Sequence, residues 1–188
     1  MGKLKFNNSK TSKDDSSEQI PWEILVADDD PEVHSLTKTV LHNFKYLGRP
    51  LKILSSYSGE QTIEVLKNNP NIVLVLLDVV MESDDAGLIV VKKIREDLKN
   101  NALQIILRTG QAGIAPEIDV VTNYAINDYK EKTELTSKKL HTSIITAIRS
   151  NINIKELESL NYEREGLLSI FDENVITSKT DKDGKIIY

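Results

Sequence analysis

The chain has 188 residues, enough for one ordinary domain and a remainder. Its 29 Asp and Glu outnumber its 24 Lys and Arg, and the net charge of -5 makes nucleic acids and anionic membranes poor partners. Cysteine is absent, which excludes disulfides, thiol chemistry and Cys-ligated zinc and suits a reducing cytoplasm. The longest apolar run, Ile72 to Leu77, is too short to span a bilayer.

Polar side chains dominate residues 1–20, which lack the apolar segment of an export signal. Met1 and Gly2 could begin a myristoylation motif, but Phe6 stands where that motif needs Ser or Thr. We therefore expect a disordered polar arm over residues 1–20, and a folded domain that begins at residue 21.

Strand and helix patterns alternate from residue 21 to about residue 150. Asp30 and Pro31 are typical of a helix N-cap followed by Pro at the first helical position, and Ser58 begins a capping box. The β-branched run from Ile72 to Leu77 indicates a strand that is covered on both faces. The expected strands cover residues 24–27, 51–57, 72–77, 103–107 and 125–129, and the expected helices begin near residues 31, 59, 88, 116 and 133.

This alternation predicts an α/β fold, a doubly wound five-stranded parallel sheet of the flavodoxin-like type with helices on both faces. Such sheets bind ligands at the carboxyl ends of their strands. The residues that follow the strands are therefore the candidates for a functional site: Asp28, Asp29, Asp78, Thr109 and Lys132.

Three carboxylates facing one crevice would repel one another, and a hard divalent cation such as Mg²⁺ would remove that repulsion. A carboxylate beside bound Mg²⁺ can attack a phosphoryl group and form an acyl phosphate. The metal, the Lys132 ammonium and the Thr109 hydroxyl could then share the charge of the phosphoryl oxygens. The pattern therefore favours a phosphoryl-transfer site.

At these strand ends the sequence resembles the receiver domain of two-component response regulators, over roughly residues 22–150. The matching segments are 24–31, 76–81, 107–110 and 128–132. The resemblance implies that Asp78 is the phosphoacceptor, that Asp29 ligates Mg²⁺ directly, and that Asp28 does so mostly through water.

The same resemblance gives roles to four further residues. It implies that the Val80 carbonyl completes the metal ligands and that Lys132 pairs with the phosphoryl group. Thr109 would hydrogen-bond to that group, and Tyr129 would be the aromatic residue that reorients with it.

The sequence departs from the usual receiver pattern at several positions. Glu82 and Thr133 stand where receivers usually carry Pro, and the loop from Glu82 to Gly87 is one residue longer. A cis bond without Pro costs about 3 kcal/mol, so we expect the Lys132–Thr133 bond to be trans or visibly strained. The variant motifs are similar to a receiver subgroup of multidomain signalling proteins, some of which end in cyclic-di-GMP phosphodiesterase domains.

Other polar residues receive ordinary interpretations. Asp30 is expected to cap a helix and not to bind metal. The acids of the longer loop, Glu82, Asp84 and Asp85, are expected to be solvated. The histidines are expected to be surface or boundary residues: His34, His42 and His141.

The last expected helix continues past the domain as a linker over residues 151–168, with an apolar stripe that needs a partner. We expect this stripe to form a homodimer, with a kink or local unwinding between Ile152 and Leu157, where the apolar spacing breaks. Residues 169–188 have the pattern of strand, Asp-Gly turn and strand, and resemble the truncated opening hairpin of a PAS-like sensor domain.

The favoured interpretation is a cytoplasmic receiver domain that takes a phosphoryl group from a sensor histidine kinase onto Asp78 with Mg²⁺. It would then alter the face formed by its fourth helix, fifth strand and fifth helix, and so switch a downstream output domain in the same chain. We expect no enzymatic turnover beyond self-phosphorylation and autodephosphorylation.

Two alternatives remain at this point. The chain could be a pseudo-receiver, a dimerisation or docking module that is never phosphorylated. It could also be a Mg²⁺-dependent phosphatase with an Asp nucleophile, but Val80 stands where such enzymes usually need a second acid.

Overall fold

The computed structural model describes residues 19–110, 126–132 and 137–174, and the short pieces 179–180, 182–183 and 185–187. Three expectations fall on other residues: nearly all of the polar arm, the helix near residue 116, and the Lys132–Thr133 bond. Within the described ranges, no helix combines the length and the apolarity that a bilayer span requires.

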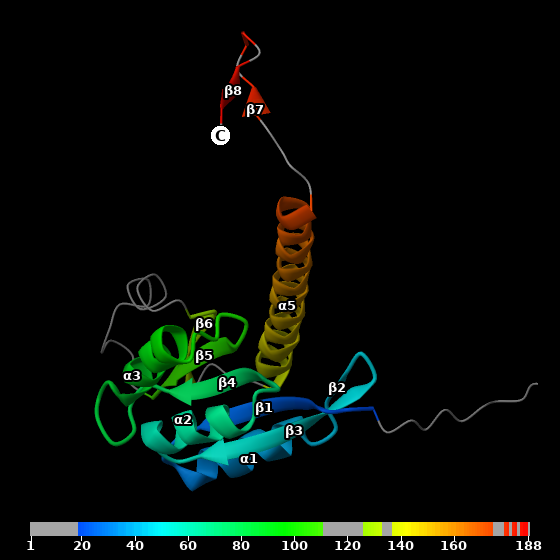
Figure 1. Ribbon diagram of the computed structural model, residues 1–188. Coiled ribbons are helices and arrows are strands. Elements are labelled where there is room, and N and C mark those ends of the chain that lie inside the picture. Colours follow the sequence, from blue (N-terminus) through cyan, green and yellow to red (C-terminus); the bar gives the residue numbers. More distant parts are fainter. Residues whose placement is uncertain are drawn as a thin grey trace, which may run out of the picture.

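The central sheet has six strands in the order β2-β3-β1-β4-β5-β6 (Figure 1). Five of them are parallel, as predicted, and their order is the flavodoxin-like one. The sequence analysis missed β2, which pairs with β3 in antiparallel orientation. The strand bounds are β1 (Trp22–Ala27), β2 (Lys45–Tyr46), β3 (Arg49–Ser56), β4 (Ile72–Asp78), β5 (Gln104–Thr109) and β6 (Asp128–Glu131).

Helices cover both faces of the sheet. They are α1 (Pro31–Leu41), α2 (Gly59–Asn68), α3 (Ala86–Lys92) with its π-helical continuation η1 (Lys93–Asp97), and α5 (Ser137–Asn174). One apolar core lies between the sheet and α2 and α3, and the other between the sheet and α1 and α5. The doubly wound architecture is therefore confirmed.

The two predicted helix caps are present. The Asp30 carboxylate accepts a hydrogen bond from the backbone N–H of Glu32 at 2.8 Å, and the Ser58 hydroxyl accepts one from Gln61 at 3.2 Å. Each cap satisfies a backbone donor that has no partner within its own helix. The cap at Asp30 fixes the start of α1 directly after the acidic residues that follow β1.

The apolar spacing from Val33 to Leu41 in the sequence predicts an apolar inward face for α1, but that face is partly polar. Leu36 is 66% exposed, whereas His34 and Thr37 are buried together with Leu41. His34 is only 2% exposed, so its assignment as a surface or boundary residue was wrong. The reason lies beneath the helix, where the strand ends present polar groups that His34 and Thr37 contact.

Helix α5 is one continuous helix of 38 residues. Leu140, Ile144 and Ile148 pack against the sheet, and the distal part rises away from it (Figure 1). The local unwinding expected between Ile152 and Leu157 is absent, because backbone hydrogen bonding does not depend on the spacing of apolar side chains.

The chain after the linker differs from the expected hairpin. Residues 169–174 belong to α5, so a strand from Ser169 onward was wrong. Two short antiparallel strands follow, β7 (Lys179–Thr180) and β8 (Ile186–Ile187). A hairpin therefore forms, but later and shorter than the sequence indicated.

Candidate functional site

Three carboxylates meet at the carboxyl end of the sheet. Asp28 and Asp29 follow β1, and Asp78 ends β4, its neighbour in the sheet. One carboxylate oxygen from each residue lies within 4.8 Å of the other two. Asp28 and Asp78 are 0% and 3% exposed, whereas Asp29 is exposed. The predicted acidic cluster thus has two buried members and one that faces solvent.

Lys132 reaches this cluster from the residue that follows β6. Its ammonium lies 2.7 Å from Asp78 Oδ2 and 3.0 Å from Asp28 Oδ2. The side chain is about one quarter exposed, so it lies between the buried acids and solvent. Residues more than fifty positions apart in sequence are therefore joined by ion pairs.

The environment changes the pKa values of the paired groups. Burial raises the pKa of the Asp78 carboxyl, and the nearby charge of Asp28 adds to this, although the hydrogen bond and charge of Lys132 act against it. Burial acts to lower the pKa of Lys132, but its hydrogen bonds to Asp78 and Asp28 and their charges raise it overall. A second cation near Asp78 would favour its ionised form.

The donor set fits Mg²⁺. Carboxylate oxygens are hard ligands of the kind that this ion prefers. Asp78 Oδ1 is buried and has no hydrogen-bond partner among the described residues. A buried carboxylate oxygen without a partner is costly, and a metal ion or a phosphoryl group would satisfy it.

The remaining predicted residues lie around the cluster. Thr109 ends β5 and is buried, and Val80 lies two residues past Asp78 in the loop before α3. Tyr129 lies on β6 with its side chain buried in the core on the side of α2 and α3. The structure thus joins Asp28 and Asp78 through Lys132, places Thr109 and Val80 at or just past the ends of β5 and β4, and places Tyr129 within β6 in the core.

Two functional neighbours of Asp28 were missed by sequence reasoning. Arg108, on β5, is 4% exposed, and its guanidinium lies 3.4 Å from Asp28 Oδ2 and 3.4 Å from Thr37 Oγ1. His34 Nε2 lies 2.8 Å from the Asp28 carbonyl oxygen. Burial lowers the pKa of Arg108, whereas the charges of Asp28 and Asp78 act to raise it. An arginine in an otherwise apolar strand could have indicated this contact.

Gly87 also escaped notice, although it supports the strand end that carries Asp78. Its backbone N–H donates to the Val79 carbonyl at 2.9 Å, and a Cβ atom at this position would overlap the Asp78 carbonyl oxygen. Only glycine allows α3 to begin this close to the end of β4. The glycine therefore helps to fix the backbone on both sides of the site.

The loop acids stay outside the cluster. Glu82, Asp84 and Asp85 are exposed, as expected. Glu82 has an additional contact, because both of its carboxylate oxygens accept a hydrogen bond from the backbone N–H of Gly59, at the start of α2. It therefore links the loop after β4 to a neighbouring helix.

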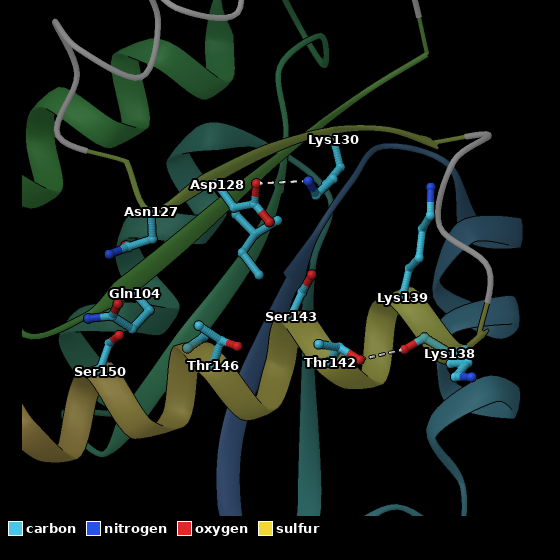
Figure 2. A pocket seen from close by; sticks show the side chains of 12 residues that line it. Gln104, Asn127, Asp128, Lys130, Lys138, Lys139, Thr142, Ser143, Thr146 and Ser150 are labelled. Atoms are coloured by element: carbon cyan, nitrogen blue, oxygen red, sulfur yellow. Dashed lines mark hydrogen bonds and ion pairs between the residues drawn. The ribbon is translucent and has the colours of Figure 1, made fainter.

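A separate cavity of about 770 Å³ lies between β6 and α5 (Figure 2). Figure 2 shows Asp128 paired with Lys130, at 3.1 Å, on the strand side, and a row of hydroxyl side chains along α5. The α5 residues of the lining include Lys138, Lys139, Thr142, Ser143, Thr146 and Ser150. This cavity is not part of the acidic cluster, but it borders the strand that leads to Lys132.

The sequence pattern of the response regulator receiver domain matches residues 24–145. The 3'3'-cGAMP-specific phosphodiesterase 2 of Vibrio cholerae is 47% identical over 132 residues, which are 70% of this chain and 25% of that protein. The two-component response regulator PprB of Pseudomonas aeruginosa is 26% identical over 158 residues, which are 80% of this chain and 55% of that protein. The chain thus spans about a quarter and about half of the lengths of these relatives.

Solved structures of receiver domains share the fold. The signal receiver domain of an HD domain-containing protein from Pseudomonas fluorescens superposes with a TM-score of 0.60 at 17% identity, over 72% of this chain and 93% of that one. A receiver domain from Clostridium thermocellum gives a TM-score of 0.57 at 22% identity, over 72% and 98%. At these identities the likeness concerns the fold alone.

Proposed function

Because the chain belongs to the response regulator receiver domain family, we propose that it accepts a phosphoryl group on Asp78 from a sensor histidine kinase, with Mg²⁺ as cofactor. The observation that carries this proposal is the buried Asp78 Oδ1, which has no hydrogen-bond partner in the described part of the chain. One carboxylate oxygen of Asp78 lies within 4.8 Å of the acids that could hold a metal, and Oδ2 of the same carboxylate pairs with Lys132 at 2.7 Å. A nucleophile needs this combination of an oxygen without a hydrogen-bond partner and nearby positive charge.

In the proposed site, Asp29, Asp78 and the Val80 carbonyl would hold Mg²⁺, and Asp28 would contact it mostly through water. The bound ion supplies positive charge that favours ionised Asp78 and neutralises the phosphoryl oxygens. A carboxylate oxygen of Asp78 attacks phosphorus while the phosphorus–nitrogen bond of the kinase phosphohistidine breaks, and the imidazole leaves with the bonding electron pair. Lys132 then pairs with a phosphoryl oxygen, and Thr109 hydrogen-bonds to another.

The proposed signal passes from the strand ends to the surface of β6 and α5. Tyr129 is buried in the described conformation and is the proposed aromatic switch. It lies on β6, the strand that borders the cavity of Figure 2 and ends next to Lys132. Movement of Thr109 toward a phosphoryl group would therefore act directly on this strand, because β5 and β6 are paired from Ile106 to Thr109.

We further propose that the receiver regulates an output domain in the same protein. The similarity to a cGAMP phosphodiesterase, of which the chain spans only a quarter, supports an enzymatic output. Helix α5 would carry the signal and pair with a second copy through its exposed leucines, and the hairpin after it would begin a PAS-like domain. The linker would then begin beyond residue 150, where α5 leaves the sheet.

The test of phosphorylation is labelling by acetyl phosphate with Mg²⁺, followed by mass spectrometry. We expect a single labelled aspartate in the wild type and none in Asp78→Asn. Asp84→Asn is the matched control, because Asp84 is an exposed acid of the next loop and should not affect labelling. Undiminished labelling of Asp78→Asn would overturn the proposed phosphoacceptor.

A pseudo-receiver remains the second candidate, because both oxygens of Asp28 contact protein cations. Such a module would dimerise or dock without phosphorylation. Beryllofluoride, which mimics a bound phosphoryl group, distinguishes the two. Mg²⁺-dependent binding of beryllofluoride to the wild type supports the phosphorylated receiver, and the absence of binding supports the pseudo-receiver.

A further inference from the structure

Asp28 lies in contact with two cations from different strands. Its Oδ2 atom is 3.4 Å from the Arg108 guanidinium and 3.0 Å from the Lys132 ammonium. Its Oδ1 atom accepts a hydrogen bond from the backbone N–H of Asp30 at 3.1 Å and is 3.2 Å from Lys132. Lys132 is partly exposed, whereas Arg108 is buried under α1 and has little access to solvent.

The polar inward face of α1 is built around this contact. Thr37 Oγ1 accepts a hydrogen bond from Arg108 Nη1. The ring nitrogen Nε2 of His34 hydrogen-bonds to the backbone carbonyl oxygen of Asp28. An apolar side chain at position 108 would continue the core formed by Ile106 on the same strand face. A buried ion pair is seldom more stabilising than such packing, so the arginine needs another explanation.

The charges of the site explain why an arginine lies at position 108. Asp28 and Asp78 are the buried acids of the cluster, and each of them contacts a protein cation, Arg108 or Lys132, whereas the third acid, Asp29, is exposed. We propose that Arg108 is a built-in counter-ion of the acidic cluster, a positioning residue that holds Asp28 in the metal-free protein and weakens Mg²⁺ binding. A fixed positive charge repels a second cation nearby, and solvent and salt screen this repulsion less when the charge is buried.

This inference rests on the proposed function, since it presupposes that the cluster binds Mg²⁺. Its test uses the full chain and measures Mg²⁺ affinity by calorimetry and thermal unfolding with and without Mg²⁺. Arg108→Met removes the charge and keeps a long side chain. We expect it to bind Mg²⁺ about tenfold more tightly than the wild type, which corresponds to about 1.4 kcal/mol. Without metal it should unfold at a lower temperature, and Mg²⁺ should raise that temperature more than in the wild type.

Three variants separate charge from structure. Arg108→Lys keeps the charge and should bind Mg²⁺ with nearly wild-type affinity. Thr37→Val removes the other partner of Arg108 without changing any charge and should leave Mg²⁺ affinity unchanged. Arg95→Met removes a partly buried arginine that donates to the Leu103 carbonyl at the opposite end of β5, and it should cost stability without affecting Mg²⁺ binding.

The outcomes are distinguishable. If the wild type does not bind Mg²⁺, the proposed function fails. If the wild type binds and Arg108→Met binds equally or more weakly, the counter-ion role is overturned while the proposed function stands. If Arg108→Met is unfolded without metal, recovery of its helical circular dichroism on addition of Mg²⁺ supports the role, and failure to recover contradicts it.

Discussion

Glu82 accepts hydrogen bonds from the backbone N–H of Gly59 with both carboxylate oxygens, at 2.9 and 3.1 Å. This contact joins the loop after Asp78 to the N-terminus of α2, where a negative charge is favourable. Glu82 stands at the position where the receivers that the sequence resembles usually carry Pro. A rigid residue is thus replaced by a side chain that fixes the loop through a neighbouring helix.

The contact of Glu82 should contribute measurably to stability. We expect Glu82→Ala to lower the free energy of unfolding by about 1 kcal/mol, because it leaves the Gly59 donor without its partner and removes a charge at a helix N-terminus. Urea unfolding measures this difference. Asp84→Ala, in the same exposed loop, should change stability little, and equal losses for the two variants would contradict the role of Glu82.

Substitution of Asp29 should change Mg²⁺ affinity, whereas substitution of Asp30 should change stability. Asp29→Ala should weaken Mg²⁺ binding strongly, because Asp29 is the exposed member of the cluster and the proposed direct ligand. Asp30→Ala should leave Mg²⁺ affinity nearly unchanged and lower stability by about 1 kcal/mol, because Asp30 caps α1. Calorimetry with Mg²⁺ and urea unfolding give the two readouts. Equal Mg²⁺ affinities in the two variants would show that Asp29 is not a ligand.

Asp78 should make the stability of the metal-free protein depend on pH. Burial raises the pKa of its carboxyl above the ordinary value, which the unfolded chain regains. Between these two values the folded protein holds a proton that the unfolded chain has released, so stability falls as pH rises through the folded pKa. The contribution is fully present only below the ordinary value.

Because the raised pKa means that the folded state disfavours the ionised carboxylate, Asp78→Asn should stabilise the metal-free protein at neutral pH. The advantage should shrink as the pH falls toward the ordinary carboxyl pKa, because the wild-type carboxyl becomes protonated over that range. Thermal unfolding in EDTA across this pH range measures the difference, with Asp84→Asn as a control whose effect should remain small throughout. An advantage that stays constant or grows at low pH would contradict the raised pKa.

The distal part of α5 should associate with a second copy. Four leucines on it are more than half exposed: Leu157, Leu160, Leu167 and Leu168. A stripe of this kind exposes more apolar surface than a monomer normally retains, and a two-fold pair would cover it. Sedimentation of the full chain at several concentrations should show a dimer. A chain that ends after Asn153 keeps the buried Asn151 and should be monomeric or more weakly associated.

Single substitutions refine this test. Leu160→Lys places a charge within the stripe and should weaken association, whereas Ser159→Lys lies on the opposite side of the helix and should not. A monomeric full chain, or a shortened chain that dimerises equally well, would exclude α5 as the contact.

The sequence predicted the parallel sheet and the acidic cluster because both depend on local patterns. Apolar strands such as 72–77 are followed directly by the acids, and Asp30 and Ser58 mark helix starts that the structure confirms. These features need no knowledge of tertiary contacts. The two-residue strand β2 was missed because so short a segment carries no period.

Tertiary contacts explain the other differences. The expected strand at 125–129 lies at 128–131, since its pairing with β5 and not its apolar residues sets its bounds. Leu36 faces solvent because polar partners under α1 favour the burial of Thr37 and His34. Arg108 is close to Asp28 only in the folded sheet, so the sequence shows a charged residue within a strand but does not identify its partner.

The continuity of α5 has a mechanical consequence. Leu140, Ile144 and Ile148 hold its first turns against the sheet, while the 22 residues from Asn153 to Asn174 continue as the same helix. At 1.5 Å per residue this free part is a lever about 33 Å long. A tilt of about 10° at its base would displace Asn174 by about 6 Å, so a side-chain rearrangement near β6 could be amplified into a domain-scale displacement at the far end. A helix broken at Ile152 would transmit none of this motion.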